Sequence, residues 1–208
     1  AGLIGLGALW FLLTESGRSL AGLGPGDRIA NALFQSVTTR TAGFNSVDLA
    51  AAGPATVLVM VMLMFIGASP GGTGGGIKTT TAAVLLGAIP TILRRERQVV
   101  IADRTVPLET VFRSAAITTL ALLLVVGGTI GLLLTQRLPF ESLLFEAVSA
   151  FGTVGLSLGV TPRLDTAGRL VVIVLMFLGR VGPLTLALLL GRGRPRRVEY
   201  PEARIMVG

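Results

Sequence analysis

Two short Thr-x-Gly segments are the parts of this sequence whose residue types and spacing could do chemistry. They are Thr41, Ala42, Gly43 and Phe44 in the first segment and Thr153, Val154, Gly155 and Leu156 in the second. The segments lie 112 residues apart, each between apolar stretches. Such a run can turn successive carbonyl oxygens toward a cation in place of its hydration shell, and the glycine adopts dihedrals that other residues avoid. The pair predicts a carbonyl-lined ion filter, with the cation bound at the first three carbonyls of each segment.

The composition places these segments in a lipid bilayer. Of the 208 residues, 51% are hydrophobic and 14% are charged. Residues 115–134 and 170–190 approach the roughly 20 residues needed to cross about 30 Å of hydrocarbon. The shorter apolar stretch 1–13 opens without Met or a basic region, so we expect a helix cut at its start and a chain that is a fragment.

Residue usage excludes several other classes of function. The sequence has no Cys and no His, which removes disulfides, thiolate metal sites and the commonest general base, so an enzyme is not expected. The net charge of +7 comes from Arg residues clustered at residues 94–113 and 192–204, beside the ends of apolar segments. This pattern predicts cytoplasmic basic segments rather than a nucleic-acid interface.

The chain is an internal duplication. A shift of 112 residues superimposes Thr41 on Thr153 and Gly43 on Gly155, and it also aligns Met64-Phe65-x-Gly67 with its copy at 176–179. Each copy has the order helix, pore loop, helix. We therefore predict an all-α membrane protein with one repeat at 1–93, a basic cytoplasmic linker at 94–111, a second repeat at 112–191 and a basic cytoplasmic tail at 192–208.

These repeats predict particular elements. Short pore helices are expected at residues 31–39 and 140–150, and spanning helices at 112–134 and 167–190, with both filters entered from outside. The second helix of the first repeat should begin at Pro54, break in a glycine-rich run at 67–76 and resume at 77–93. A break inside a membrane is tolerated only beside protein or water, so the run should line a cavity.

Two filter segments cannot surround an ion by themselves. Carbonyl filters of this kind are built from four segments around a central pore. Two more must come from upstream copies in the same chain, which is the favoured expectation, or from a second copy of this chain.

Four stretches carry a resemblance to a known family. They read FQSVTTRTAGFN at 34–45, GGTGGGIKT at 71–79, AFGTVGLS at 150–157 and GRVGPLT at 179–185. Together they resemble, in order, the third and fourth repeats of the Trk/Ktr/HKT potassium transporters. The resemblance implies that K+ is the transported ion, that Gly43 and Gly155 are two of four filter glycines, and that this chain binds no cofactor.

The resemblance also implies a gate and partners. The gate would be the intramembrane loop below the filter with Arg180 facing it, and its residues are Gly67, Ser69, Gly71, Gly72, Thr73, Gly74, Gly75, Gly76 and Arg180. The first two repeats, a homodimer partner, membrane lipid and cytoplasmic nucleotide-binding subunits would complete the assembly in a bacterial plasma membrane.

Several residues near these segments have competing interpretations. The glycine-rich run fails the nucleotide-binding pattern because no glycine directly precedes Lys78. Lys78 either lines the inner cavity or, as we favour, reaches the cytoplasmic surface. Arg180 either serves the gate or pairs with Glu146. Arg40 is expected to brace the first filter from behind, and Glu146 is interpreted as a bracing acceptor.

Two other functions remain open from the sequence. A secondary symporter could use the broken helix as its substrate site. A non-conducting membrane assembly module could keep the fold without a pore. Substitution of the filter glycines separates the pore from the symporter, and absence of flux in a folded four-repeat assembly would indicate the module.

Overall fold

The computed structural model describes residues 2–72, 74–94, 98–101 and 103–182. Its elements are, in order, α1 (Gly2–Glu15), α2 (Pro25–Thr38), η1 (Leu49–Ala51), α3 (Pro54–Phe65), α4 (Thr79–Leu93), β1 (Val99–Ile101), β2 (Arg104–Val106), α5 (Leu108–Thr135), α6 (Phe140–Phe151), η2 (Thr161–Arg163) and α7 (Thr166–Val181). The predicted helical fold class is confirmed.

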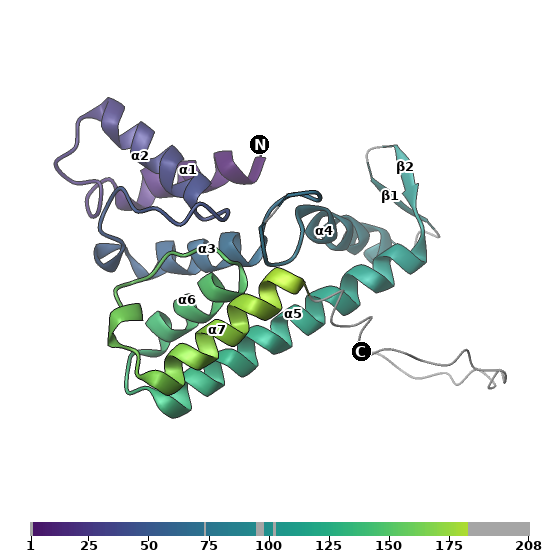
Figure 1. Cartoon of the computed structure of the whole chain (residues 1–208). Helices are drawn as coiled ribbons and strands as arrows, with labels where there is room; N and C mark the ends of the chain where they lie inside the picture. Colours follow the sequence, from purple (N-terminus) through teal and green to yellow (C-terminus); the bar gives the residue numbers. More distant parts are fainter. Residues whose placement is uncertain (1, 73, 95–97, 102, 183–208) are drawn as a thin grey trace.

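The helices form two units of the same kind. In the first, α1 packs against the short helix α2 and against α3, and in the second, α5, α6 and α7 pack against one another. Figure 1 shows α7 lying along the long helix α5, with α4 and the β1–β2 hairpin at the far end of α5. The contact of α3 with α6 joins the two units. Phe65, the last residue of α3, and Phe151, the last residue of α6, stack there with ring centroids 6.2 Å apart.

Some predicted boundaries were wrong by several residues. The first pore helix begins at Pro25 rather than at residue 31, because Gly24 is extended and proline suits the first helical turn. In the same way α5 starts at Leu108, directly after the extended Pro107. The expected linker contains an antiparallel hairpin that was not predicted, in which Val99 pairs with Val106. The expected end of the last helix at 190 and the tail 192–208 lie outside the described residues.

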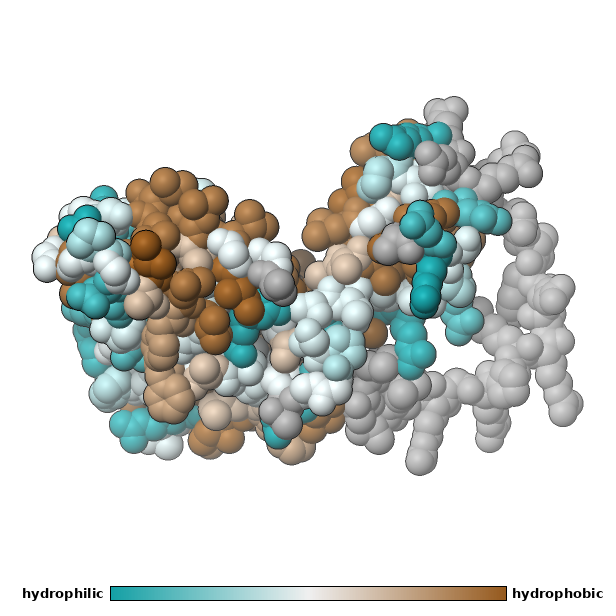
Figure 2. Space-filling model, turned by 90° about the horizontal axis from the view of Figure 1, so that it is seen from above, coloured by the Kyte–Doolittle hydropathy of each residue, from teal (hydrophilic) through white to brown (hydrophobic). Residues whose placement is uncertain are grey.

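Apolar side chains cover much of the surface. Among the described helices, α5 alone is long and apolar enough to cross a membrane by length and composition, while α1, α3 and α4 are shorter apolar helices. The 28 residues of α5 correspond to roughly 42 Å of helix at 1.5 Å per residue. Leu123 and Leu134 on α5 are 62% and 82% exposed. Broad apolar areas are also visible in Figure 2.

Candidate functional site

Both Thr-x-Gly segments, named the filter turns after their predicted role, fold as strained turns after α2 and α6, the predicted pore helices. Thr41 and Thr153 have φ of 77° and 52°, and Gly43 and Gly155 have φ of 75° and 93°. A positive φ is rare for a β-branched residue and costs about 1–3 kcal/mol. Of the three non-glycine residues with positive φ in the described part of the chain, two are these threonines. The matched strain indicates a shared backbone geometry that packing maintains.

The two turns lie against each other although they are 112 residues apart. A Cβ atom added to Gly43 would overlap the carbonyl oxygen of Val154, and one added to Gly155 would lie 3.6 Å from the Cα of Gly43. The space in which a side chain of residue 43 would begin is thus occupied by a carbonyl of the second turn. Glycine is required at position 43 both for its φ and for this close approach.

Hydroxyl groups at the ends of the pore helices hold the last residue of each turn. Thr38 Oγ1 donates to the Phe44 carbonyl at 2.7 Å and accepts from the Phe44 amide at 2.9 Å. Ser149 Oγ donates to the Leu156 carbonyl at 2.6 Å. Sequence reasoning missed both hydroxyl residues. A hydroxyl residue six or seven positions before the last filter residue was the signal that could have revealed them.

A second pair of side chains, Gln35 and Glu146, binds the irregular segments that follow the turns. Gln35 Nε2 donates to Ser46 Oγ at 3.1 Å in the first repeat. In the second, Glu146 accepts from Ser157 Oγ at 2.8 Å and from Thr161 Oγ1 at 2.6 Å. Both oxygens of this buried carboxylate are therefore used by hydroxyl donors. The interpretation of Glu146 as a bracing acceptor is confirmed.

The bracing residues and the filter residues of the two repeats align at different offsets. Gln35 corresponds to Glu146, and Thr38 to Ser149, at a shift of 111 residues, whereas the filter residues correspond at 112. The second repeat thus inserts one residue between its pore helix and its filter. The backbone agrees, because Ala42 N donates to Thr38 O four residues back, while Val154 N donates to Ser149 O five residues back.

The glycine-rich run connects α3 and α4 and touches both turns. Ile66 and Ile77 at its base form an isolated parallel bridge. Gly74, Gly75 and Gly76 are buried, whereas Ser69, Gly71 and Gly72 are exposed. Thr73 lies outside the described residues. The predicted interruption of the helix is confirmed, and the run lies beside the filter turns.

The basic side chains of Arg40 and Lys78 donate hydrogen bonds to carbonyls of this run. Arg40 Nη2 donates to the Gly67 carbonyl of the run at 2.8 Å, and its expected bracing of the first filter from behind stays a prediction. Lys78 Nζ donates to the Gly74 carbonyl at 2.7 Å. Lys78 thus binds the loop backbone, and its expected place at the cytoplasmic surface stays a prediction.

Arg180 lies in the last turn of α7, beside the same region. A Cβ atom added to its neighbour Gly179 would overlap the Phe151 carbonyl oxygen, and that oxygen lies 2.9 Å from a Cβ placed on Gly75. The end of α7 and the loop therefore meet at one carbonyl. The role of Arg180 in the gate stays a prediction.

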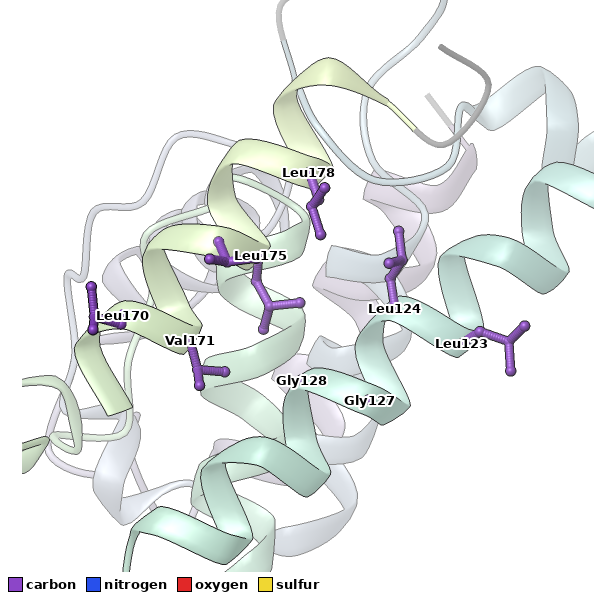
Figure 3. A pocket seen from close by; sticks show the side chains of 9 residues that line it. Leu123, Leu124, Gly127, Gly128, Leu170, Val171, Leu175 and Leu178 are labelled. Carbon is purple, nitrogen blue, oxygen red and sulfur yellow. The ribbon is translucent and has the colours of Figure 1, made fainter. Parts of the chain in front are cut away.

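Two hollows flank the second repeat. One of about 270 Å³ lies between the second filter turn and α7, and Glu146, Thr153 and Met176 are among its lining residues. The other, of about 410 Å³, is an apolar groove between α5 and α7. Figure 3 shows Leu175 and Leu178 of α7 facing Leu124 and Gly128 of α5 across this groove.

The sequence of this arrangement matches a known protein family. The profile of the TrkH family, described as cation transport protein, matches residues 7–196. The chain belongs to the TrkH family. The match includes both filter turns, both pore helices and the glycine-rich run, so the resemblance seen in the sequence is confirmed.

Curated relatives cover nearly all of the chain. The Ktr system potassium uptake protein B of Vibrio alginolyticus is 41% identical over 99% of this chain and 45% of its own length. The protein of the same name from Bacillus subtilis is 39% identical over 88% of this chain and 41% of its own length. Potassium/sodium uptake protein NtpJ of Enterococcus hirae is 39% identical over 97% of this chain and 47% of its own. The chain spans about half the length of these relatives.

A solved structure supports the fold independently. The potassium transporter TrkH from Vibrio parahaemolyticus superimposes with a TM-score of 0.76, at 22% identity, over 92% of this chain and 42% of that one. The two-unit helical arrangement is therefore the fold of the corresponding part of TrkH.

Proposed function

We propose that this chain forms half of a potassium uptake pore in a membrane. The observation that carries the proposal is the contact of the two strained Thr-x-Gly turns, in which the Val154 carbonyl lies against the Gly43 backbone. Turns fixed in this way can present carbonyl oxygens to a dehydrated cation without reorganising when it arrives. The relatives named as potassium uptake proteins support K+ as the ion.

The proposed path follows from the fold. K+ enters from outside, exchanges water for the carbonyls of residues 41–43 and 153–155, and then meets the glycine-rich loop and Arg180 as a gate. Inward movement is favoured by about 2.3 kcal/mol per charge for each 100 mV of negative-inside potential. The path requires no chemical step.

The remaining parts of the assembly are also proposed. Two further filter segments complete the ring of four. Apolar surface such as that of α5 contacts lipid, and the basic segments at 94–111 and 192–208 lie in the cytoplasm of a bacterial cell. There the chain, as a homodimer, meets nucleotide-binding regulatory subunits.

The decisive experiment compares ion selectivity with and without the filter glycines. The full-length native form is reconstituted in liposomes, and K+ and Na+ fluxes are measured for it and for Gly43→Ser and Gly155→Ser. We expect the ratio of K+ to Na+ flux to fall by roughly tenfold or more, which corresponds to about 1.4 kcal/mol of discrimination. The matched control is Gly22→Ser, because Gly22 also has a positive φ of 85° but nothing within 4 Å of an added Cβ.

The outcomes separate the candidate functions. A preference for K+ that is lost in the filter variants and kept in the control supports the pore. Coupled uptake of another solute that is unaffected by both filter substitutions would instead support a symporter, and folded protein without flux would support an assembly module.

A further inference from the structure

The glycine-rich loop is closed at its base. Besides the Ile66–Ile77 bridge, Ile77 N donates to Phe65 O at 3.1 Å, and Thr79 N donates to Ala68 O at 3.3 Å. These bonds fix the points at which the chain leaves α3 and enters α4. The segment between them can change position only by breaking contacts of its own.

Two hydrogen bonds tie this loop to the filter, one from each repeat. Arg40, directly before the first turn, donates through Nη2 to the carbonyl of Gly67 on the outgoing limb at 2.8 Å. Thr153, the first residue of the second turn, accepts through Oγ1 from the amide of Gly75 on the returning limb at 2.8 Å. Each limb is thus attached to a different filter turn.

Close packing accompanies the hydrogen bonds. A Cβ atom on Gly74 would lie 2.7 Å from Thr41 Cγ2, and one on Gly75 would lie 2.8 Å from Thr153 Cγ2. Non-bonded carbon atoms essentially never approach each other to either distance. The bare loop backbone therefore lies directly against the side chains of the two filter threonines.

The two hydrogen bonds differ in chemistry. The Arg40 bond is charge-assisted and stronger than a neutral one. The Thr153 bond satisfies the amide of Gly75, a buried residue that would otherwise lose a partner. Thr41 holds the equivalent filter position, but within the described ranges its hydroxyl makes no hydrogen bond to the loop. The attachment is consequently asymmetric, and this asymmetry can be tested.

We propose that Arg40 and Thr153 are positioning residues that latch the loop against the filter. The latch rests on the proposed function, because it assigns the loop's closed position to contacts with the filter itself. When both hydrogen bonds break, the loop is free to leave the space below the turns. Filter geometry and loop position are thereby coupled, because Thr153 is part of the second filter turn and its hydroxyl binds the loop.

The test reads the position of the loop directly. Residues 1–208 contain no Cys, so Ser69→Cys, at an exposed position of the loop, adds one thiol, and the assembly without this substitution gives the background labelling. In the full-length native assembly in vesicles, the rate of its modification by a hydrophilic maleimide is measured with reagent on both sides. We expect Thr153→Val to raise the rate roughly threefold to tenfold and Arg40→Gln roughly tenfold or more, as expected for loss of a neutral and a charge-assisted hydrogen bond.

Matched variants separate the latch from general damage. Thr153→Ser keeps the hydroxyl and should return the rate close to that of Ser69→Cys alone, and Arg40→Lys should restore it in part. Thr41→Val removes a hydroxyl from the equivalent position and should leave the labelling rate unchanged. Equal rates in Thr153→Val and Thr153→Ser, or an increase in Thr41→Val as large as in Thr153→Val, would overturn the latch.

Failure of the latch is distinguishable from failure of the proposed function. K+ flux is recorded in the same vesicles for the Ser69→Cys form. Selective flux with labelling rates that do not respond to Thr153→Val and Arg40→Gln overturns the latch alone. Labelling that responds as expected in protein without selective flux supports the latch and overturns the pore.

Discussion

Single residues determine how firmly each filter turn is held. In the second repeat, Glu146 accepts two hydroxyl hydrogen bonds, whereas its counterpart Gln35 makes one. Gln35 Oε1 is buried and has no hydrogen-bond partner among the described residues. A buried acceptor without a partner costs free energy, so Gln35 is the less favourable brace of the two.

This difference predicts unequal effects of removing the two braces. Glu146→Ala leaves the hydroxyls of Ser157 and Thr161 without their acceptor, and we expect it to lower the free energy of unfolding by about 1–3 kcal/mol. Glu146→Gln should cost less, because its amide oxygen still accepts one hydrogen bond. Gln35→Ala should also cost less, since it removes an unsatisfied group together with one bond. Thermal unfolding in detergent measures all three, and a larger loss for Gln35→Ala than for Glu146→Ala would contradict the prediction.

At the scale of elements, the first residues of α7 are bound to the end of α5. Asp165 Oδ1 caps the helix by accepting from Gly168 N at 2.8 Å, and it also accepts from Gln136 Nε2 at the end of α5 at 2.5 Å. The backbone hydrogen bond from Gly168 and then that from Gln136 hold the pKa of Asp165 below its usual value. One carboxylate thus fixes the ends of two helices to each other.

Acid should loosen this junction. Because the pKa of Asp165 is lower in the folded state, its contribution to stability is fully present above the ordinary Asp value of about 3.9 and is lost as the pH falls through the folded value. Thermal midpoints in detergent should therefore decline as the pH falls below about 4, with a smaller decline in Asp165→Asn. Identical pH profiles for the two forms would show that another carboxylate controls the transition.

At the scale of the whole molecule, the proposed topology places two loops on opposite sides of the membrane. Asn45 follows the first filter turn, and Arg104 belongs to the β1–β2 hairpin between the repeats. Both residues are exposed. If the filters are entered from outside and the basic linker is cytoplasmic, these two positions lie on opposite sides of the membrane.

Thiol labelling tests that orientation. In right-side-out vesicles, we expect Asn45→Cys to react with an impermeant maleimide at once and Arg104→Cys to react only after permeabilisation. Inverted vesicles should reverse the order, which serves as the internal control. Labelling of both positions from one side in intact vesicles would reject the proposed topology.

The sequence predicted the features that depend on local pattern. The apolar stretches predicted the helices. The paired Thr-x-Gly motifs and the glycine-rich break predicted the repeat and the placement of the filter turns. It could not supply contacts that exist only after folding, such as Arg40 with Gly67 or Ser149 with Leu156. The bond of Lys78 to Gly74 is of the same kind, because its acceptor becomes available only when the loop turns back.

The closed base of the glycine-rich loop has a consequence for how such a protein can change over evolution. Because Ile66 and Ile77 pair with each other, residues inserted between them would not displace α3 or α4. Doubling the length of a flexible loop costs only about 0.6 kcal/mol in closure entropy. The glycine-rich loop can therefore be lengthened, shortened or exchanged while α3 and α4 keep their alignment.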